Sequence, residues 1–127
     1  MFDFSQIPLF ALADRRLAWI DRRQQVLAQN IANADTPGWR SRDLKPFAAQ
    51  LAAPSVALAR TDPLHLAGGA AAGAATASPQ TGERAPDGNA VAVDTELMKV
   101  AETETANELT TQLTRTYLGM FRTAIGR

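Results

Sequence analysis

The sequence predicts a mainly α-helical protein in which two long terminal helices pair as an antiparallel, coiled-coil-like hairpin. Two observations support this fold class: apolar residues recur every three or four positions within residues 10–31, and they do so again within residues 94–125. A third observation is that large apolar side chains are scarce between these stretches, where residues 67–79 read AGGAAAGAATASP. We therefore expect an irregular middle segment that contains only short helix and strand pieces.

The N-terminal helix is expected within residues 1–33. Its apolar positions alternate spacings of three and four, which is typical of a heptad seam, and polar Gln24 fills one position. The seam residues are Phe10, Ala13, Leu17, Ile20, Leu27 and Ile31. The opposite face is rich in arginine, including Arg15, Arg22 and Arg23, and we expect it to meet solvent or a polar partner. Pro8 is suited to a first helical turn.

A turn is expected after this helix. Asp35-Thr36-Pro37-Gly38 combines an Asx-type start, a proline with fixed φ and a glycine that can take positive φ, so the helix should end near Asn33. Asn30 and Asn33 lie one helical turn apart, and we expect one of them to serve the helix C-terminus. An extended piece should follow from Trp39, and then a short helix over residues 44–51 that Pro46 interrupts early.

The middle of the chain, residues 34–93, is predicted to hold this turn, extended segments and a flexible Ala/Gly-rich linker over residues 67–86. Asp87-Gly88-Asn89 is a further turn signal. The alternation of Val91 and Val93 then leads to Asp94, which is expected to cap the last helix.

The C-terminal helix is expected over residues 94–127. Its predicted apolar stripe comprises Leu97, Ala101, Leu109, Leu113, Met120 and Ala124, widened by Val100, Tyr117, Leu118, Phe121 and Ile125. Many threonines occupy the middle of this helix, and β-branched residues lower helix propensity. Packing must therefore stabilise it.

Composition excludes several classes of function. The chain has no cysteine, so it offers no disulfide framework, thiolate metal site or cysteine nucleophile. Thirteen basic residues balance thirteen acidic ones, which does not favour binding to nucleic acid. His65 has no nearby metal-ligand partners, and Glu104 and Glu108 are expected to form a solvated acidic face. We expect no enzyme activity, cofactor, metal ion or small-molecule substrate, and neither a cleaved secretory signal nor a membrane span.

The two apolar stripes instead favour a building block of a larger assembly. Two helices of this length bury a single seam between them, and small two-element structures are usually marginal without oligomerisation. Remaining apolar residues such as Trp19, Leu118 and Phe121 would then be contact surface.

Several motifs resemble known proteins. The run from Asn30 to Trp39, Asn-Ile-Ala-Asn-Ala-Asp-Thr-Pro-Gly-Trp, resembles the signature of bacterial flagellar rod and hook axial proteins. Four further segments are similar to the flagella basal body rod protein family, in particular to its proximal-rod members. They are Ser41-Arg42-Asp43-Leu44, residues 61–66, residues 87–94 and the ending Gly119-Met120-Phe121-Arg122-Thr123-Ala124-Ile125.

The resemblance implies a structural part of the proximal rod, the drive shaft that transmits torque from the membrane-embedded motor to hook and filament. It implies export by the flagellar type III apparatus without a cleaved signal, and a place in the basal body within the periplasmic space. The implied partners are other rod proteins, copies of the chain in a helical tube, and the membrane-embedded ring and export gate at the rod base.

On this hypothesis two groups of residues are site candidates. Those for helix packing and assembly are Leu17, Ile20, Leu27, Ile31, Leu109, Leu113, Met120 and Ile125. Those for the family turn are Asn30, Asn33, Thr36, Pro37, Gly38 and Trp39. The alternative hypothesis is a secretion chaperone or adaptor that holds another axial protein through its helices and stays in the cytoplasm.

Overall fold

The computed structural model describes residues 7–52, 76–77 and 91–126. In chain order these form α1 (Pro8–Ala32), β1 (Arg42–Asp43), α2 (Phe47–Ala52), β2 (Thr76–Ala77) and α3 (Val93–Ile125). The predicted mainly helical fold with two long terminal helices is confirmed. The motif at residues 61–66 and most of the predicted linker at residues 67–86 lie outside the described residues.

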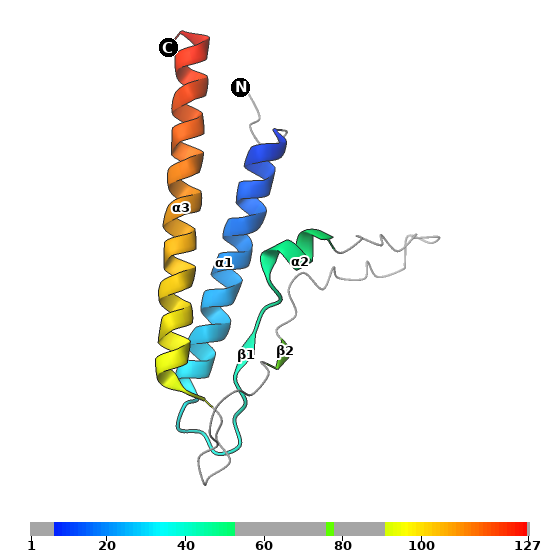
Figure 1. Cartoon of the computed structure of the whole chain (residues 1–127), viewed down its shortest axis with the longest axis vertical. Helices are drawn as coiled ribbons and strands as arrows, with labels where there is room; N and C mark the ends of the chain where they lie inside the picture. Colours follow the sequence, from blue (N-terminus) through cyan, green and yellow to red (C-terminus); the bar gives the residue numbers. More distant parts are fainter. Residues whose placement is uncertain (1–6, 53–75, 78–90, 127) are drawn as a thin grey trace, which may run out of the picture.

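Helices α1 and α3 run side by side in opposite directions, with the end of α1 beside the start of α3 (Figure 1). Helix α1 has 25 residues and α3 has 33. At 1.5 Å per residue, α3 is therefore about 12 Å longer than α1. This excess lies at the C-terminal end of α3, which extends past the start of α1 in Figure 1.

The ends of α1 follow from local sequence. Ile7 precedes the helix in an extended conformation, and Pro8 occupies the first helical turn, where no backbone N–H is needed. At the other end, the Asn33 side chain donates to the Gln29 carbonyl at 2.8 Å and accepts a bond from the Thr36 hydroxyl at 3.2 Å. Of the two candidate asparagines, Asn33 is thus the one that serves the helix terminus.

The predicted cap of α3 is wrong. The helix begins at Val93, its N-cap position is Ala92, and no side chain caps it. Asp94 lies inside the first turn instead, together with Glu96. Both carboxylates interact favourably with the positive end of the helix dipole there. At the far end Gly126 adopts a left-handed conformation with φ of 77°, which is a common way to end a helix.

Short elements complete the described structure. Strands β1 and β2 pair antiparallel, with Arg42 opposite Ala77 and Asp43 opposite Thr76. Residues 76–77 therefore form a strand inside the segment that was predicted to be linker. Pro46 does not interrupt α2 but begins it, because its carbonyl accepts bonds from the backbone N–H groups of Ala49 and Gln50.

Helix α1 is buried on two faces, which explains why it holds most of the core. One face packs against α3, and Phe10 meets Phe121 there with ring centroids 6.0 Å apart. The other meets the segment after the turn: the Trp19 indole donates to the Lys45 carbonyl at 3.0 Å and its ring lies 6.0 Å from that of Phe47. Trp19, which was predicted to be contact surface for other subunits, therefore contacts its own chain. Arg23 likewise meets Asp43 of the same chain, whereas Arg15 and Arg22 are exposed as predicted. The buried apolar residues are Phe10, Ile20, Val26, Leu27 and Leu44.

Candidate assembly site

A cluster of polar side chains joins three elements near the turn end of the hairpin. Asn30 and Glu96 are its centre, with exposed fractions of 1% and 2%. The Asn30 amide donates to the Glu96 carboxylate at 2.8 Å and to the Arg42 carbonyl at 2.6 Å. The Arg42 backbone N–H in turn donates to the Asn30 side-chain oxygen at 3.0 Å. The Asn30 side chain thus pairs with the backbone of β1 as a neighbouring strand would, while also holding α3.

Charged residues extend this cluster. Lys99 Nζ lies 2.9 Å from Glu96 Oε1 and 4.0 Å from Asp43 Oδ2. Arg23 makes two bonds to the Asp43 carboxylate, at 3.0 and 3.1 Å, in the bidentate geometry that suits a guanidinium. We call Arg23, Asn30, Asp43, Glu96 and Lys99 the polar clamp. It joins α1, β1 and α3.

The clamp favours the charged form of its arginine. Burial opposes the charged form of Arg23, but the hydrogen bonds and negative charge of Asp43, with a contribution from Glu102 at 3.4 Å, outweigh it and raise the pKa of Arg23 above its ordinary value. Opening the clamp would leave buried charges and amide groups without partners, which is costly away from water. Its geometry therefore favours one relative position of the three elements.

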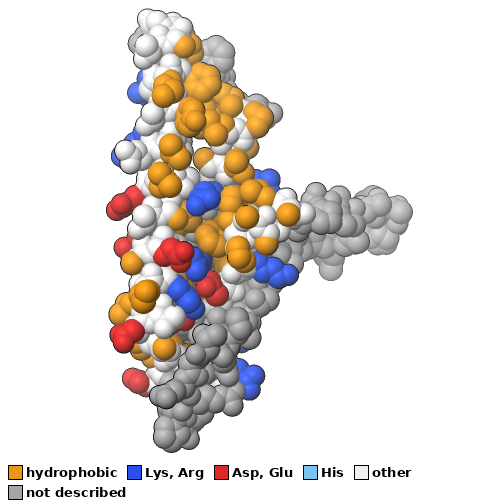
Figure 2. All heavy atoms as spheres, in the orientation of Figure 1, with side chains coloured by type: hydrophobic (Ala, Val, Ile, Leu, Met, Phe, Trp, Pro, Cys, Tyr) orange, Lys and Arg blue, Asp and Glu red, His pale blue; other side chains and the backbone are white. Residues whose placement is uncertain are grey.

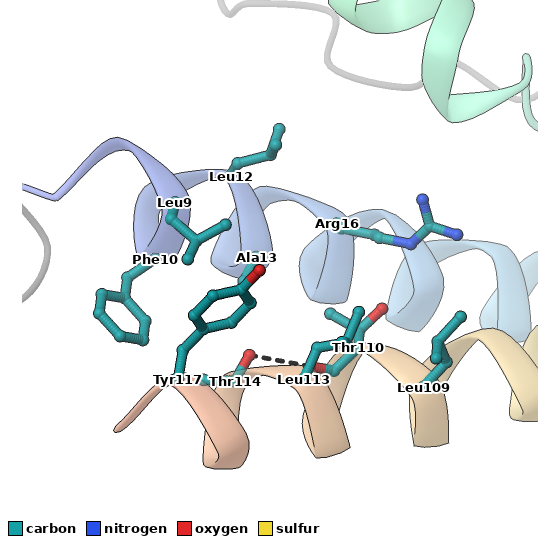
Figure 3. Close-up of a pocket in the computed structure, with 10 residues that line it drawn as sticks. All are labelled: Leu9, Phe10, Leu12, Ala13, Arg16, Leu109, Thr110, Leu113, Thr114 and Tyr117. Carbon is teal, nitrogen blue, oxygen red and sulfur yellow. Dashed lines mark hydrogen bonds between the residues drawn. The ribbon is translucent and has the colours of Figure 1, made fainter. Parts of the chain in front are cut away.

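The second part of the site is an apolar groove between the helices at the other end of the hairpin. Its volume is about 280 Å³. Helix α1 contributes Leu9, Phe10, Leu12, Ala13 and Arg16, and α3 contributes Leu109, Thr110, Leu113, Thr114 and Tyr117. Figure 3 shows the Tyr117 ring reaching from α3 toward α1, and the Thr114 hydroxyl bonded back to the Thr110 carbonyl at 2.8 Å.

The groove lies within a larger apolar surface. Hydrophobic side chains gather between the two helices in the upper part of the molecule, whereas acidic and basic side chains lie together lower down (Figure 2). Leu9 and Leu12 on α1 and Leu109 and Leu113 on α3 line the groove yet remain 40–53% exposed. The hairpin thus has a polar, closed end and an apolar, open end.

The predicted packing residues separate into two groups. On α1, Ile20 and Leu27 are fully buried, and Leu17 and Ile31 are half-buried. On α3 the expected stripe does not form the seam within the chain. Leu109, Leu113, Met120 and Ile125 are 53%, 48%, 59% and 60% exposed.

Polar residues occupy the buried face of α3 instead. Glu96, Thr103 and Thr110 are the buried residues of this helix. The Thr103 and Thr110 hydroxyls each donate to the carbonyl four residues earlier, at 2.7 Å, so their burial leaves no donor unpaired. We call Leu109, Leu113 and Met120 the leucine stripe. It lies about a quarter of a turn around the helix from the threonine face.

The turn motif has several distinct roles. Asn30 belongs to the clamp and Asn33 to the end of α1, while Thr36 bonds Asn33. Gly38 has φ of 73°, the conformation for which the motif needs glycine. Pro37 is exposed, and the half-buried Trp39 ring lies under the Arg42 guanidinium at 5.8 Å.

Sequence reasoning missed Arg23, Asp43, Glu96 and Lys99 as a joint site. The Glu96–Lys99 spacing of three was a visible signal for a helical ion pair. Nothing local indicated that Asp43 and Arg23 would meet them. No helix in the described parts of the chain has the length and apolar character needed to cross a membrane.

Comparison with known proteins identifies the family. A family model described as flagella basal body rod protein matches residues 13–40, which cover most of α1 and the turn motif. The chain is 35% identical to the flagellar basal body rod protein FlgB of Agrobacterium fabrum over 133 aligned positions, which cover 95% of each chain.

Two other relatives agree. Identity to FlgB of Escherichia coli is 39% over 98 positions, covering 64% of this chain and 66% of that one. Identity to FlgB of Proteus mirabilis is 50% over 42 positions, covering 33% and 30%. The chain therefore belongs to the FlgB family of flagellar basal body rod proteins and is a structural component of the rod.

Proposed function

We propose that the chain builds the proximal part of the rod and helps transmit torque from the membrane-embedded motor to the hook and filament. Its proposed partners are other rod proteins and further copies of itself in a helical tube, with the membrane-embedded ring and export gate at the base. The proposed location is the periplasmic part of the basal body, reached through the flagellar type III apparatus. The proposed role is structural and includes no catalysis.

One observation supports this role above others: the apolar surface at the open end of the hairpin. Leu109, Leu113 and Met120 lie exposed along α3, and Leu9 and Leu12 lie exposed on α1 beside the groove. Full burial of such a side chain contributes about 1.5–3 kcal/mol relative to exposure. Neighbouring subunits that cover this surface would therefore stabilise an assembly substantially.

The unequal ends of the hairpin suit an open-ended assembly. The apolar groove lies at one end, and the polar clamp at the other. Contacts between unlike surfaces repeat without closing when the rotation between subunits does not close, and they then generate a helical tube. We propose that Leu109, Leu113, Met120 and Ile125 contact neighbouring subunits, while Leu17, Ile20, Leu27 and Ile31 pack mainly within the chain.

Substitution of Leu113 by glutamate tests this proposal. Leu113 is half exposed, so Leu113→Glu should leave the hairpin folded but place a charge on the contact surface. We expect loss of swimming and at least about a tenfold drop in the amount of chain in purified basal bodies, as expected when a buried contact gains an unpaired charge. Gln112→Glu is the matched control, because Gln112 is exposed on another face of α3 and gains the same charge.

Two results would contradict the proposal. Normal swimming with normal incorporation of the Leu113→Glu chain would show that this surface makes no essential contact. Absence of the unmodified chain from purified basal bodies, with abundance in the cytosol, would instead support the chaperone or adaptor hypothesis.

A further inference from the structure

The buried residues of helix α3 are polar, although Phe121 near its end meets Phe10 of α1. Thr103 and Thr110 are buried, whereas Leu109 and Leu113 on the neighbouring face remain about half exposed. Burial of apolar surface is the main driving force of folding, so the helical packing alone would favour a rotated α3 with the leucines inside. Some feature of the molecule must oppose that rotation.

The polar clamp opposes it. A rotation of α3 by about a quarter of a turn would move Glu96 away from Asn30. This would break the hydrogen bond between the Asn30 amide and the Glu96 carboxylate, which links α1 to α3. The same rotation would carry Glu102 toward the seam, because Glu102 lies two helical turns before Leu109 on the same face. In the observed rotation Glu102 is exposed and contacts Arg23 at 3.4 Å.

We propose that Asn30 and Glu96 determine the rotation of α3, and so keep the leucine stripe on the outside for neighbouring subunits. Single buried polar residues are known to specify the register of paired helices at a cost in stability. Here the Asn30 amide suits this role, because it holds β1 and α3 at the same time. That the leucine stripe contacts neighbouring subunits rests on the proposed function. That Asn30 and Glu96 determine the rotation of α3 does not.

The absence of cysteine from the chain makes a direct test possible. Thr110→Cys places a thiol on the buried face of α3, and Leu113→Cys places one on the exposed stripe. Reaction of the purified full-length chain with a maleimide should label the thiol at position 110 about tenfold more slowly than the thiol at 113, because labelling there requires local opening.

Each cysteine is then combined with Asn30→Leu and Glu96→Leu, which remove the central bond and leave apolar side chains in its place. We expect the ratio of the two labelling rates to fall to about one or to invert, as the stripe turns inward. The matched control is Gln29→Leu with Glu104→Leu, two exposed positions in the same helices, which should leave the ratio unchanged.

An unchanged ratio in the Asn30→Leu/Glu96→Leu chain overturns the proposal. Circular dichroism checks that the helices remain in this variant. If they are lost, the ratio of the two labelling rates is measured instead in the single variant Asn30→Leu, which leaves Glu96 paired with Lys99. The measurement uses the free chain and involves no rod. The labelling experiment tests the rotation of α3, whereas the swimming experiment tests the contacts of the leucine stripe. Either proposal can therefore be contradicted without the other.

Discussion

At the scale of single residues, Asn30 of α1 links its helix to both β1 and α3. Its side chain makes three hydrogen bonds, two to the backbone of Arg42 and one to Glu96, and it is almost fully buried. An asparagine amide can donate and accept at once, which a carboxylate or an ammonium group cannot do. The same side chain can therefore satisfy both a strand backbone and a carboxylate.

We predict that Asn30→Ala lowers the free energy of unfolding by about 2–4 kcal/mol, because it leaves the Arg42 backbone groups and the Glu96 carboxylate without this partner. Urea denaturation followed by circular dichroism measures the change. Gln29→Ala is the control, since Gln29 is exposed. A loss from Asn30→Ala no larger than that of the control would mean that the amide bonds add no stability.

At the scale of elements, the hairpin depends on backbone conformations as well as packing. Gly38 in the turn has positive φ, whereas Gly119 lies within α3. At neither position does a heavy atom from elsewhere in the described parts of the chain lie within 4 Å of where a Cβ would stand. The two glycines thus differ in backbone conformation but not in available space. This makes them a matched pair.

We predict opposite effects of alanine at these positions. Gly38→Ala should destabilise the chain by about 1 kcal/mol or more, because an L side chain is strained at positive φ. Gly119→Ala should stabilise it by about 0.5–1 kcal/mol, because alanine is the better helix former. Thermal unfolding of both variants tests this. A stabilising Gly38→Ala would show that the turn adopts another conformation in solution.

The helical elements also show how far sequence patterns extend. Periodicity predicted both helices, and the turn chemistry of residues 35–38 predicted where α1 ends. Periodicity did not predict which face of α3 is buried. Each threonine hydroxyl bonds within its own helix, so a face that counts as polar in the sequence can still be buried.

At the scale of the whole molecule, the chain combines a closed, polar end with an open, apolar end. The clamp holds the turn end, while the longer α3 extends past α1 at the other end. Phe10 and Phe121 meet near that end, at a centroid distance of 6.0 Å. This asymmetry separates residues that maintain the fold from residues that are available to neighbours.

We predict that Leu27→Glu and Leu113→Glu both prevent swimming, but for different reasons. Leu27 is fully buried in the α1–α3 core, so a charge there should unfold the free chain and remove its helical circular dichroism. Leu113→Glu should retain that signal. If the Leu27→Glu chain keeps full helicity and a cooperative unfolding transition, the core does not pack as the structure shows.

The sequence by itself determined the two long helices, the turn after α1 and the family to which the chain belongs. These features depend on local periodicity, on proline and glycine geometry and on motif order, all of which are properties of neighbouring residues. The buried α1 residues Ile20 and Leu27 could be recognised for the same reason.

Only the tertiary structure decided the rotation of α3 and the membership of the polar clamp. Arg23, Asp43 and Lys99 are far apart in sequence, and their meeting depends on how α1, β1 and α3 come together. Whether a helix buries leucine or threonine depends on the balance between apolar burial and the cost of leaving buried polar groups unpaired. That balance is settled by contacts between elements, which a local pattern does not contain.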